Sequence, residues 1–98
     1  MKSLSNTQNR FLRSKSHPLK AVVIIAGKGL NENVQGAIEE ALAHHELIKV
    51  KIKVDSREDK AELVEEILKL TNAHKIQLIG HVLTLYRPSD AHKIVLPK

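Results

Sequence analysis

The fold is decided by the stretch Ile48-Lys49-Val50-Lys51-Ile52-Lys53-Val54, in which aliphatic and lysine residues alternate without a fault. Successive side chains of a β-strand point to opposite faces of the sheet. The stretch therefore predicts a strand with four aliphatic side chains on one face and three lysines on the other. The lysine face also implies that helices do not cover both faces of the sheet throughout.

A helix is expected on each side of this strand. Asn31 can cap the first one, and Asp55 or Ser56 can cap the second, which ends at Asn72 because asparagine tolerates the left-handed conformation. The apolar stripe of the first helix has i, i+3, i+4, i+7 spacing and lies opposite three acids. The stripe comprises Val34, Ala37, Ile38, Ala41, Leu42 and His45, and the acids are Glu39, Glu40 and Glu46. The stripe of the second comprises Ala61, Val64, Ile67, Leu68 and Thr71.

The remaining elements are an N-terminal helix, another strand and a hairpin. Ser5 and Gln8 have the spacing of a capping box for a helix from about residue 6 to residue 16. The unbroken apolar run 21–25 predicts a strand that is covered on both faces and central in the sheet. Strands at about 75–79 and 82–87 turn tightly at Gly80-His81. The apolar residues 94–96 of the tail 88–98 either add a short strand or dock on the domain.

This order predicts an α/β fold with the sequence α-β-α-β-α-β-β and a four-stranded mixed sheet with packed helices. The chain has 98 residues, which suffices for one domain, residues 1–98, with residues 1–18 as a basic N-terminal helix. It has no cysteine, which excludes a disulfide framework and a thiolate zinc site and fits a reducing compartment. No apolar run approaches the length of a spanning helix or resembles a signal peptide, so we expect a cytoplasmic protein.

The formal net charge of +5 is concentrated at the N-terminal end. Residues 1–30 contain six Lys or Arg and no acid, whereas residues 31–98 contain ten Lys or Arg and eleven acids. Such asymmetry favours an oriented contact with a polyanion, nucleic acid first and an anionic membrane second. A solvated basic arm and an organelle transit peptide are the alternatives. The candidate binding residues in this region are Arg10, Arg13, Lys15 and Lys20.

Gly27-Lys28-Gly29 lies between a predicted strand and a helix N-terminus. Exposed backbone N–H groups and the helix dipole attract an anion at such a position, and phosphate is the natural ligand. The spacing is neither that of a P-loop nor a G-x-G-x-x-G fingerprint, because Asn33 stands where a third glycine is needed. Glycines that serve only a tight turn are the alternative.

Lys49, Lys51 and Lys53 are spaced by about 6.6 Å per step along their strand, close to the phosphate spacing of an extended single strand. A solvated face or a sheet edge guarded by lysines is the alternative. Phe11 and Tyr86 are the only aromatic residues other than histidine, and of these only Tyr86 could stack on a base. We therefore expect a nucleic acid to be recognised mostly by its backbone and shape.

The sequence predicts no catalytic, metal or cofactor site. His44 and His45 point about 100° apart on a helix, and Lys49 stands where a zinc-protease motif needs its second histidine. No paired carboxylate or serine nucleophile has a recognisable setting, so an enzyme is not expected.

Several linked segments resemble the YhbY-like, or CRM (chloroplast RNA splicing and ribosome maturation), RNA-binding domain. These segments are Leu19 to Leu30, His44-His45-Glu46-Leu47-Ile48-Lys49-Val50-Lys51, Asp55 to Glu58, and Gly80 followed by Leu83-Thr84-Leu85-Tyr86-Arg87-Pro88. The resemblance covers nearly the whole chain. It implies a fold like the C-terminal domain of translation initiation factor three. For a bacterial stand-alone member it also implies association with precursors of the large ribosomal subunit.

The family carries a G-x-x-G loop after the first strand, whose two glycines correspond to Ala26 and Gly29. Ala26 departs from this pattern. Our hypothesis is that Ala26 keeps a negative φ and that Gly27 supplies a positive φ one residue later.

We thus predict a monomeric, non-enzymatic protein that binds precursor ribosomal RNA during large-subunit assembly, with no membrane contact, cofactor or small-molecule substrate. The predicted phosphate loop consists of Ala26, Gly27, Lys28 and Gly29; Lys49, Lys51, Lys53 and Arg87 are further candidates. A ribosome-associated protein-interaction module that uses residues 94–96 is the alternative, and a small phospho-ligand enzyme is a third class.

Overall fold

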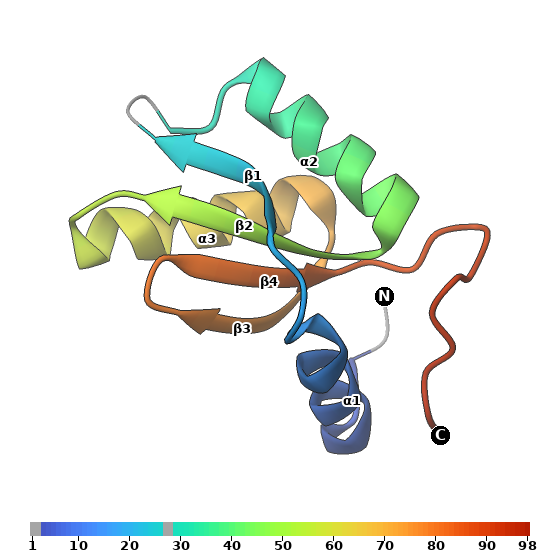
Figure 1. The fold of residues 1–98 in the computed structure, drawn as a ribbon. Helices are drawn as coiled ribbons and strands as arrows, with labels where there is room; N and C mark the ends of the chain where they lie inside the picture. The colour runs from blue at the N-terminus through green and yellow to red at the C-terminus, as the bar shows by residue number, and fades with distance from the viewer. Residues whose placement is uncertain (1–2, 27–28) are drawn as a thin grey trace.

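The computed structural model describes residues 3–26 and 29–98, and its elements follow the predicted order. The helices are α1 (Asn6–Ser16), α2 (Glu32–His45) and α3 (Arg57–Thr71), and the strands are β1 (Ala21–Ala26), β2 (Leu47–Lys53), β3 (His74–Ile79) and β4 (Val82–Tyr86). The strands form one sheet in the order β1-β2-β4-β3, in which β1 is parallel to β2 and the other neighbours are antiparallel (Figure 1). The predicted α/β fold with a four-stranded mixed sheet is confirmed.

The residues expected to begin and end the helices do so. Ser5 and Gln8 form the capping box of α1, in which each backbone N–H donates to the other side chain, at 3.0 and 3.1 Å. Asn31 caps α2, and of the two residues predicted to cap α3, Ser56 does so. Asn72 ends α3 in the left-handed conformation, with φ 59°. Each cap satisfies a backbone group that the helix leaves without an internal partner.

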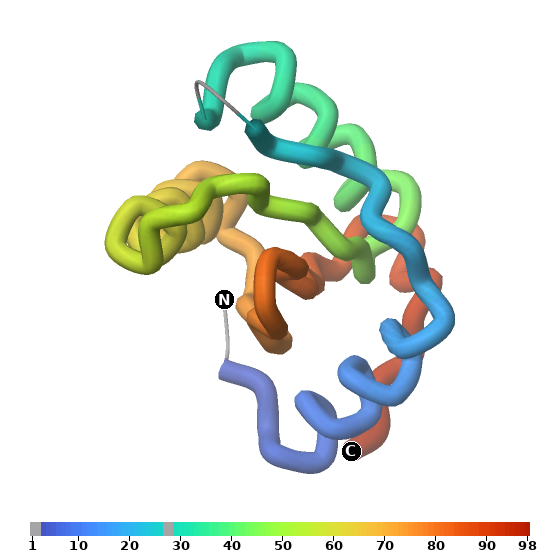
Figure 2. Tube along the Cα trace, turned by 60° about the vertical axis from the view of Figure 1, so that its left-hand side comes forward, coloured from blue at the N-terminus to red at the C-terminus, as the bar shows by residue number. Residues whose placement is uncertain are grey.

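The main core lies between one face of the sheet and the two helices α2 and α3 (Figure 2). The predicted alternation over residues 48–54 is confirmed, because the aliphatic side chains of this stretch enter the core or pack against it and its lysines point the other way. The buried members of the core are Val23, Ile25, Ile38, Leu42, Ile48, Val50, Ile52, Leu63, Val64, Ile67, Leu83 and Leu85.

A second, smaller cluster covers one end of the opposite sheet face. It consists of Leu12 from α1 and Leu47, Ile76 and Tyr86 from three strands, all buried. Leu4, Phe11, Ile94 and Leu96 pack around it, so the C-terminal tail docks beside α1 and adds no strand (Figures 1 and 2). The prediction that helices cover only part of this face is confirmed.

The prediction that β1 is central and covered on both faces is wrong. β1 forms an edge of the sheet, and Val22 and Ile24 are more than half exposed. A run of β-branched residues has no polar position that would reveal an open face, so hydrophobicity alone made the strand look fully buried. Val23 and Ile25 fill the core, while their neighbours point to the opposite, uncovered face.

The helix stripes also differ in detail from the prediction. Ala37, His45 and Ala61 are exposed, whereas Leu63, which was not expected in the core, is buried. Alanines at the margin of a stripe gain little from burial, so a larger side chain one or two positions away decides how the helix rotates. None of the described helices is long and apolar enough to cross a membrane.

Glu46, predicted to face solvent, is fully buried. Its carboxylate accepts hydrogen bonds from the backbone N–H groups of Ser89, Lys93 and Ile94, at 2.9, 3.1 and 2.8 Å, and from the Ser89 hydroxyl. Burial raises the pKa of Glu46, but these hydrogen bonds outweigh burial and lower the pKa to about 2. A charged glutamate therefore anchors the tail to the end of α2.

Candidate nucleic-acid interface

The part of the second sheet face that α1 and the tail leave uncovered is called the open face here; it comprises Val22, Ile24, Lys49, Lys51, Lys53, Val82 and Ile79. Its centre is the lysine row of β2. Lys51 lies between Ile24 of β1 and Val82 of β4, and Lys53 lies beside Ala26. Lys51 and Lys53 are exposed, and Lys49 is partly buried. The row therefore presents charge along the middle of the sheet.

Exposed aliphatic side chains flank the lysine row. Val22 is 53%, Ile24 55% and Ile79 66% exposed. Single exposed apolar residues are ordinary, but these three occupy both sides of one cationic row. A surface of this kind can attract an anionic chain electrostatically and contact its less polar parts.

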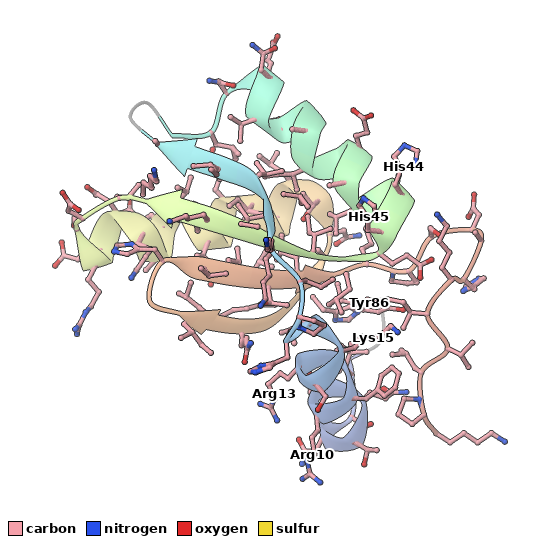
Figure 3. The ribbon with its side chains drawn as sticks, in the orientation of Figure 1. Arg10, Arg13, Lys15, His44, His45 and Tyr86 are labelled. Atoms are coloured by element: carbon pink, nitrogen blue, oxygen red, sulfur yellow. The ribbon has the colours of Figure 1, made fainter. Side chains whose placement is uncertain are left out.

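The basic residues of the N-terminal region lie next to this face. Arg10, Arg13 and Lys15 project from α1 and Lys20 precedes β1, and all four are exposed (Figure 3). Lys15 and Lys20 come together in a groove at the start of β1, whereas Arg10 and Arg13 lie farther along α1. Cations therefore lie on α1, which covers one end of this sheet face, and on β2, where the face is uncovered.

The acids lie on the other side. The described elements α1, β1, β2, β3 and β4 contain no Asp or Glu. Eight of the eleven acids belong to α2 and α3, which cover the opposite sheet face, namely Glu32, Glu39, Glu40, Glu58, Asp59, Glu62, Glu65 and Glu66. The molecule therefore has one cationic side and one largely anionic side, a polarity that net charge alone conceals.

The predicted phosphate loop is described only at its two ends. Ala26 ends β1 and is not among the described residues with positive φ, while Gly29 has φ +78°, a conformation that favours glycine. Gly27 and Lys28 lie outside the described residues. Gly29 also lines a shallow cavity with Asp59, Glu62 and Glu66. These acids of α3 repel an anion that reaches the loop from their side, whereas Lys53 attracts an anion that approaches along β2.

Arg87 lies away from the other candidates. Its guanidinium forms an ion pair with Glu39 of α2 at 2.9 Å and donates to the Thr71 carbonyl of α3 at 2.8 Å. These contacts join the end of β4 to both helices of the core layer. Arg87 therefore belongs to the anionic side of the molecule and is not part of the open face.

Tyr86 cannot stack on a base, contrary to the prediction. It is 2% exposed, lies under α1 and the tail, and stacks on His74 with ring centroids 6.2 Å apart. Burial, and then the charge of Glu46, raise the pKa of Tyr86. Phe11 is partly buried in the same cluster. Neither aromatic residue is thus placed on the open face.

The histidines and acids of the described residues do not gather into a metal site. Within 3–26 and 29–98, no group of three His, Cys, Asp or Glu side chains is arranged to hold a metal ion. His44 and His45 have ring centroids 6.4 Å apart on the exposed side of α2 (Figure 3). Glu46, the acid with a strongly shifted pKa, is fully occupied by hydrogen bonds from the tail.

Fold and surface together define a class of small α/β proteins in which two helices cover one sheet face and a cationic second face stays partly uncovered. The model of the CRS1 / YhbY (CRM) domain matches residues 4–87, and the chain belongs to this family. An "RNA-binding protein" of Haemophilus influenzae is 48% identical over 98 residues, covering 100% of this chain and 99% of the relative. The "Probable RNA-binding protein YqeI" of Bacillus subtilis is 39% identical over 95 residues, covering 96% and 99%.

A solved structure supports the same assignment. The solution structure of SAV1595 from Staphylococcus aureus superposes with a TM-score of 0.82 at 36% sequence identity. The match covers 97% of this chain and all of the other. The fold expected from the resemblance to the CRM domain is therefore confirmed.

Proposed function

We propose that this protein binds RNA without catalysing a reaction. The binding surface consists of the open face, the basic residues of α1 with Lys20, and the loop 26–29. Relatives named as RNA-binding proteins at up to 48% identity support this function. Arg87 is left out of the surface, because its guanidinium is held by Glu39 and Thr71.

The observation that carries the proposal is the separation of charge between the two sides of the sheet. Lysines occupy the uncovered side together with an acid-free α1, and eight acids occupy the helices of the covered side. A polyanion is attracted to the first side and repelled by the second, which fixes its orientation on the protein. Lys53 pairs with Ala26, so the lysine row leads directly to the loop that the family resemblance assigns to phosphate binding.

The expected mode of binding is contact with the RNA backbone. Lysine–phosphate contacts position a nucleic acid but carry no sequence information by themselves. The open face offers aliphatic rather than aromatic side chains, so several bases cannot stack in a row as on an RRM sheet. Discrimination between sequences should therefore be weak over most of the surface.

The proposed target is precursor ribosomal RNA, and the proposed role is assistance in assembly of the large ribosomal subunit by a monomer in the cytoplasm. The family resemblance suggests this target. Crosslinking in cells followed by sequencing of the bound RNA tests it directly. Enrichment of large-subunit precursor sequences is the expected result, and a dominant enrichment of unrelated messenger RNA would contradict it.

The central test reverses charge on the open face. The double variant Lys51→Glu, Lys53→Glu should weaken binding of single-stranded RNA about tenfold or more at low salt. The slope of log affinity against log salt should flatten by about 1.4, since each lost phosphate contact on a single strand accounts for about 0.7. Filter binding at several salt concentrations measures both quantities.

The matched control is Arg57→Glu, Lys69→Glu. Both residues are exposed on α3, and the change in net charge is identical. This control should retain most of its RNA affinity. Equal losses in the two double variants would show that only net charge matters, which contradicts the assignment of the open face. Lys28→Glu tests the loop in the same assay, and unchanged affinity and slope would exclude the loop.

The alternative of a protein-interaction module that uses the tail loses its main support. Ile94 and Leu96 pack on the cluster around Leu12, and Gln8 donates a hydrogen bond to the Pro97 carbonyl at 3.1 Å. In the tail stretch 94–96 only Val95 is largely exposed, at 82%. The apolar tail residues therefore complete this fold.

A further inference from the structure

We infer that a groove at the start of β1 holds one unstacked nucleobase of the bound RNA. The inference rests on the proposed RNA-binding function and adds a base-contacting site to a surface that otherwise recognises phosphate. The groove has a volume of about 550 Å³, within the range of small-molecule sites. It is lined by Lys15, Pro18, Leu19, Lys20, Val22, His45, Leu47, Ile48 and Ile94.

The groove has an apolar interior with partly exposed walls. Leu47 and Ile48 are nearly fully buried, whereas Leu19 is 38% and Val22 53% exposed. An inserted ring would remove apolar surface of these walls from water, which is favourable. A flat, weakly polar body such as a nucleobase fits this interior better than a hydrated ion does.

The pairing of β1 with β2 is irregular beside the groove. Ala21 pairs with Lys49 and Val23 pairs with Val50, so Val22 is an extra residue that has no partner in the ladder. This irregularity is a β-bulge, a feature that re-aims a side chain and is frequent beside functional sites. The bulge places the Val22 side chain both in the groove and on the open face.

Two lysines place positive charge at the groove. Lys15 comes from α1 (Figure 3), and Lys20 comes from the segment before β1. The other side of the sheet edge carries His45, from the last turn of α2. The described lining contains no Asp or Glu. Cations around an apolar slot match a nucleotide, whose base is weakly polar and whose flanking phosphates are anionic.

Continuity with the open face favours RNA over an acidic peptide. Val22 belongs to both surfaces, and Lys49, the first lysine of the row, pairs with Ala21 beside the groove. The six residues of β1 separate the groove from the loop 26–29 by about 17 Å, given a strand rise of about 3.3 Å per residue. One extended RNA segment that follows the lysine row can therefore reach both ends.

A larger groove of about 670 Å³ beside the tail lacks these features. None of the ten described residues that line it is Lys or Arg. Burial lowers the pKa of His74, one of its lining residues, which disfavours a positive charge in this groove. The groove at β1 therefore differs from the groove beside the tail by its lysines and not by a larger volume.

The test compares a groove variant with a matched surface variant on two oligomers. Leu19→Ala, Val22→Ala removes the walls, and Leu70→Ala removes a half-exposed leucine from α3 on the anionic side. The probes are a short uridine oligonucleotide and an abasic ribose-phosphate oligomer of the same length. The wild type and Leu70→Ala should bind the uridine oligomer about fivefold more tightly than the abasic one. The groove variant should bind both oligomers equally, with an unchanged salt slope.

A measurement on the wild type needs no variant. Methyl NMR should show the Val22 and Leu47 resonances shifting with the uridine oligomer and much less with the abasic one. Equal shifts with both oligomers, or none, would overturn the inference. Self-association of the wild type that the groove variant abolishes would also overturn it, because the groove would then be a contact between two copies.

The outcomes separate this inference from the proposed function. If Lys51→Glu, Lys53→Glu weakens RNA binding while the groove variant binds like the wild type, the groove is excluded and RNA binding stands. If the wild type binds neither oligomer, both proposals fail.

Discussion

The two ends of one sheet face contrast sharply in this protein. At one end, Ile76 of β3 is buried with Leu12 and Tyr86 under α1 and the tail. At the other end, Ile79 of the same strand is 66% exposed, and Val82 of β4 separates it from Lys51 of the lysine row. Both ends carry aliphatic residues, but only one is covered. The N-terminal helix and the tail therefore cover one part of this face and leave the other part accessible to a ligand.

The covered end should carry stability, and Ile76→Thr should show the largest effect. Threonine keeps the β-branched shape but loses apolar volume and places a hydroxyl in a buried cluster. We expect the free energy of unfolding to fall by about 3 kcal/mol. Urea denaturation followed by circular dichroism measures the change. A loss below about 0.5 kcal/mol, the usual effect of surface substitutions, would mean that α1 and the tail do not cover this end in solution.

Glu46→Gln should have the next largest effect. Glutamine matches the shape of glutamate but places an NH₂ group against N–H donors of the tail, so part of the acceptor set is lost. We expect a loss of about 2 kcal/mol in the free energy of unfolding. Glu40→Gln, on an exposed position of α2, is the control and should be nearly neutral. Equal stability of the two variants would show that the anchor is not needed.

Acid should release the same anchor. The pKa of Glu46 in the folded state, about 2, lies below its ordinary value, so its stabilising contribution is complete above that ordinary value and is lost as the pH falls toward 2. The stability difference between the wild type and Glu46→Gln should therefore be constant above about pH 5 and shrink below it. Tyr86, the single tyrosine, lies under the tail and reports this change by its near-ultraviolet circular dichroism. A difference that persists unchanged to pH 2.5 would contradict the lowered pKa.

The sequence predicted the elements better than their surroundings. Local signals such as the capping box at Ser5 and the alternation of residues 48–54 act within a few residues, and the structure confirms both. The edge position of β1 depends on which strands pair, which an unbroken apolar run cannot reveal. Burial of Tyr86 depends on a tail that returns from the other end of the chain.

The burial of Glu46 also depends on residues far along the chain. Glu46 follows the last residue of α2 with φ 64°, so helical spacing from Ile38 and Leu42 does not decide where its side chain points. A charged residue at a helix end ordinarily indicates exposure. The partners that make burial tolerable, the N–H groups of residues 89, 93 and 94, lie more than 40 positions away along the chain and carry no sequence signal of their own.

The smallest effect on stability is expected at the open end, where Ile79→Thr repeats the change made at Ile76. Because Ile79 is 66% exposed, little apolar burial is lost, and the β-branched side chain preserves the preference for the strand. The free energy of unfolding should change by less than about 0.5 kcal/mol. The pair holds residue type, strand and sheet face constant. Ile76 lies at the register shift of β3, whereas Ile79 pairs with Val82, so the difference in stability between the two variants measures mainly, though not solely, coverage by α1 and the tail. Similar losses at both positions would show that the open end is buried in solution, for instance between two copies, and would remove the accessible surface on which RNA binding depends.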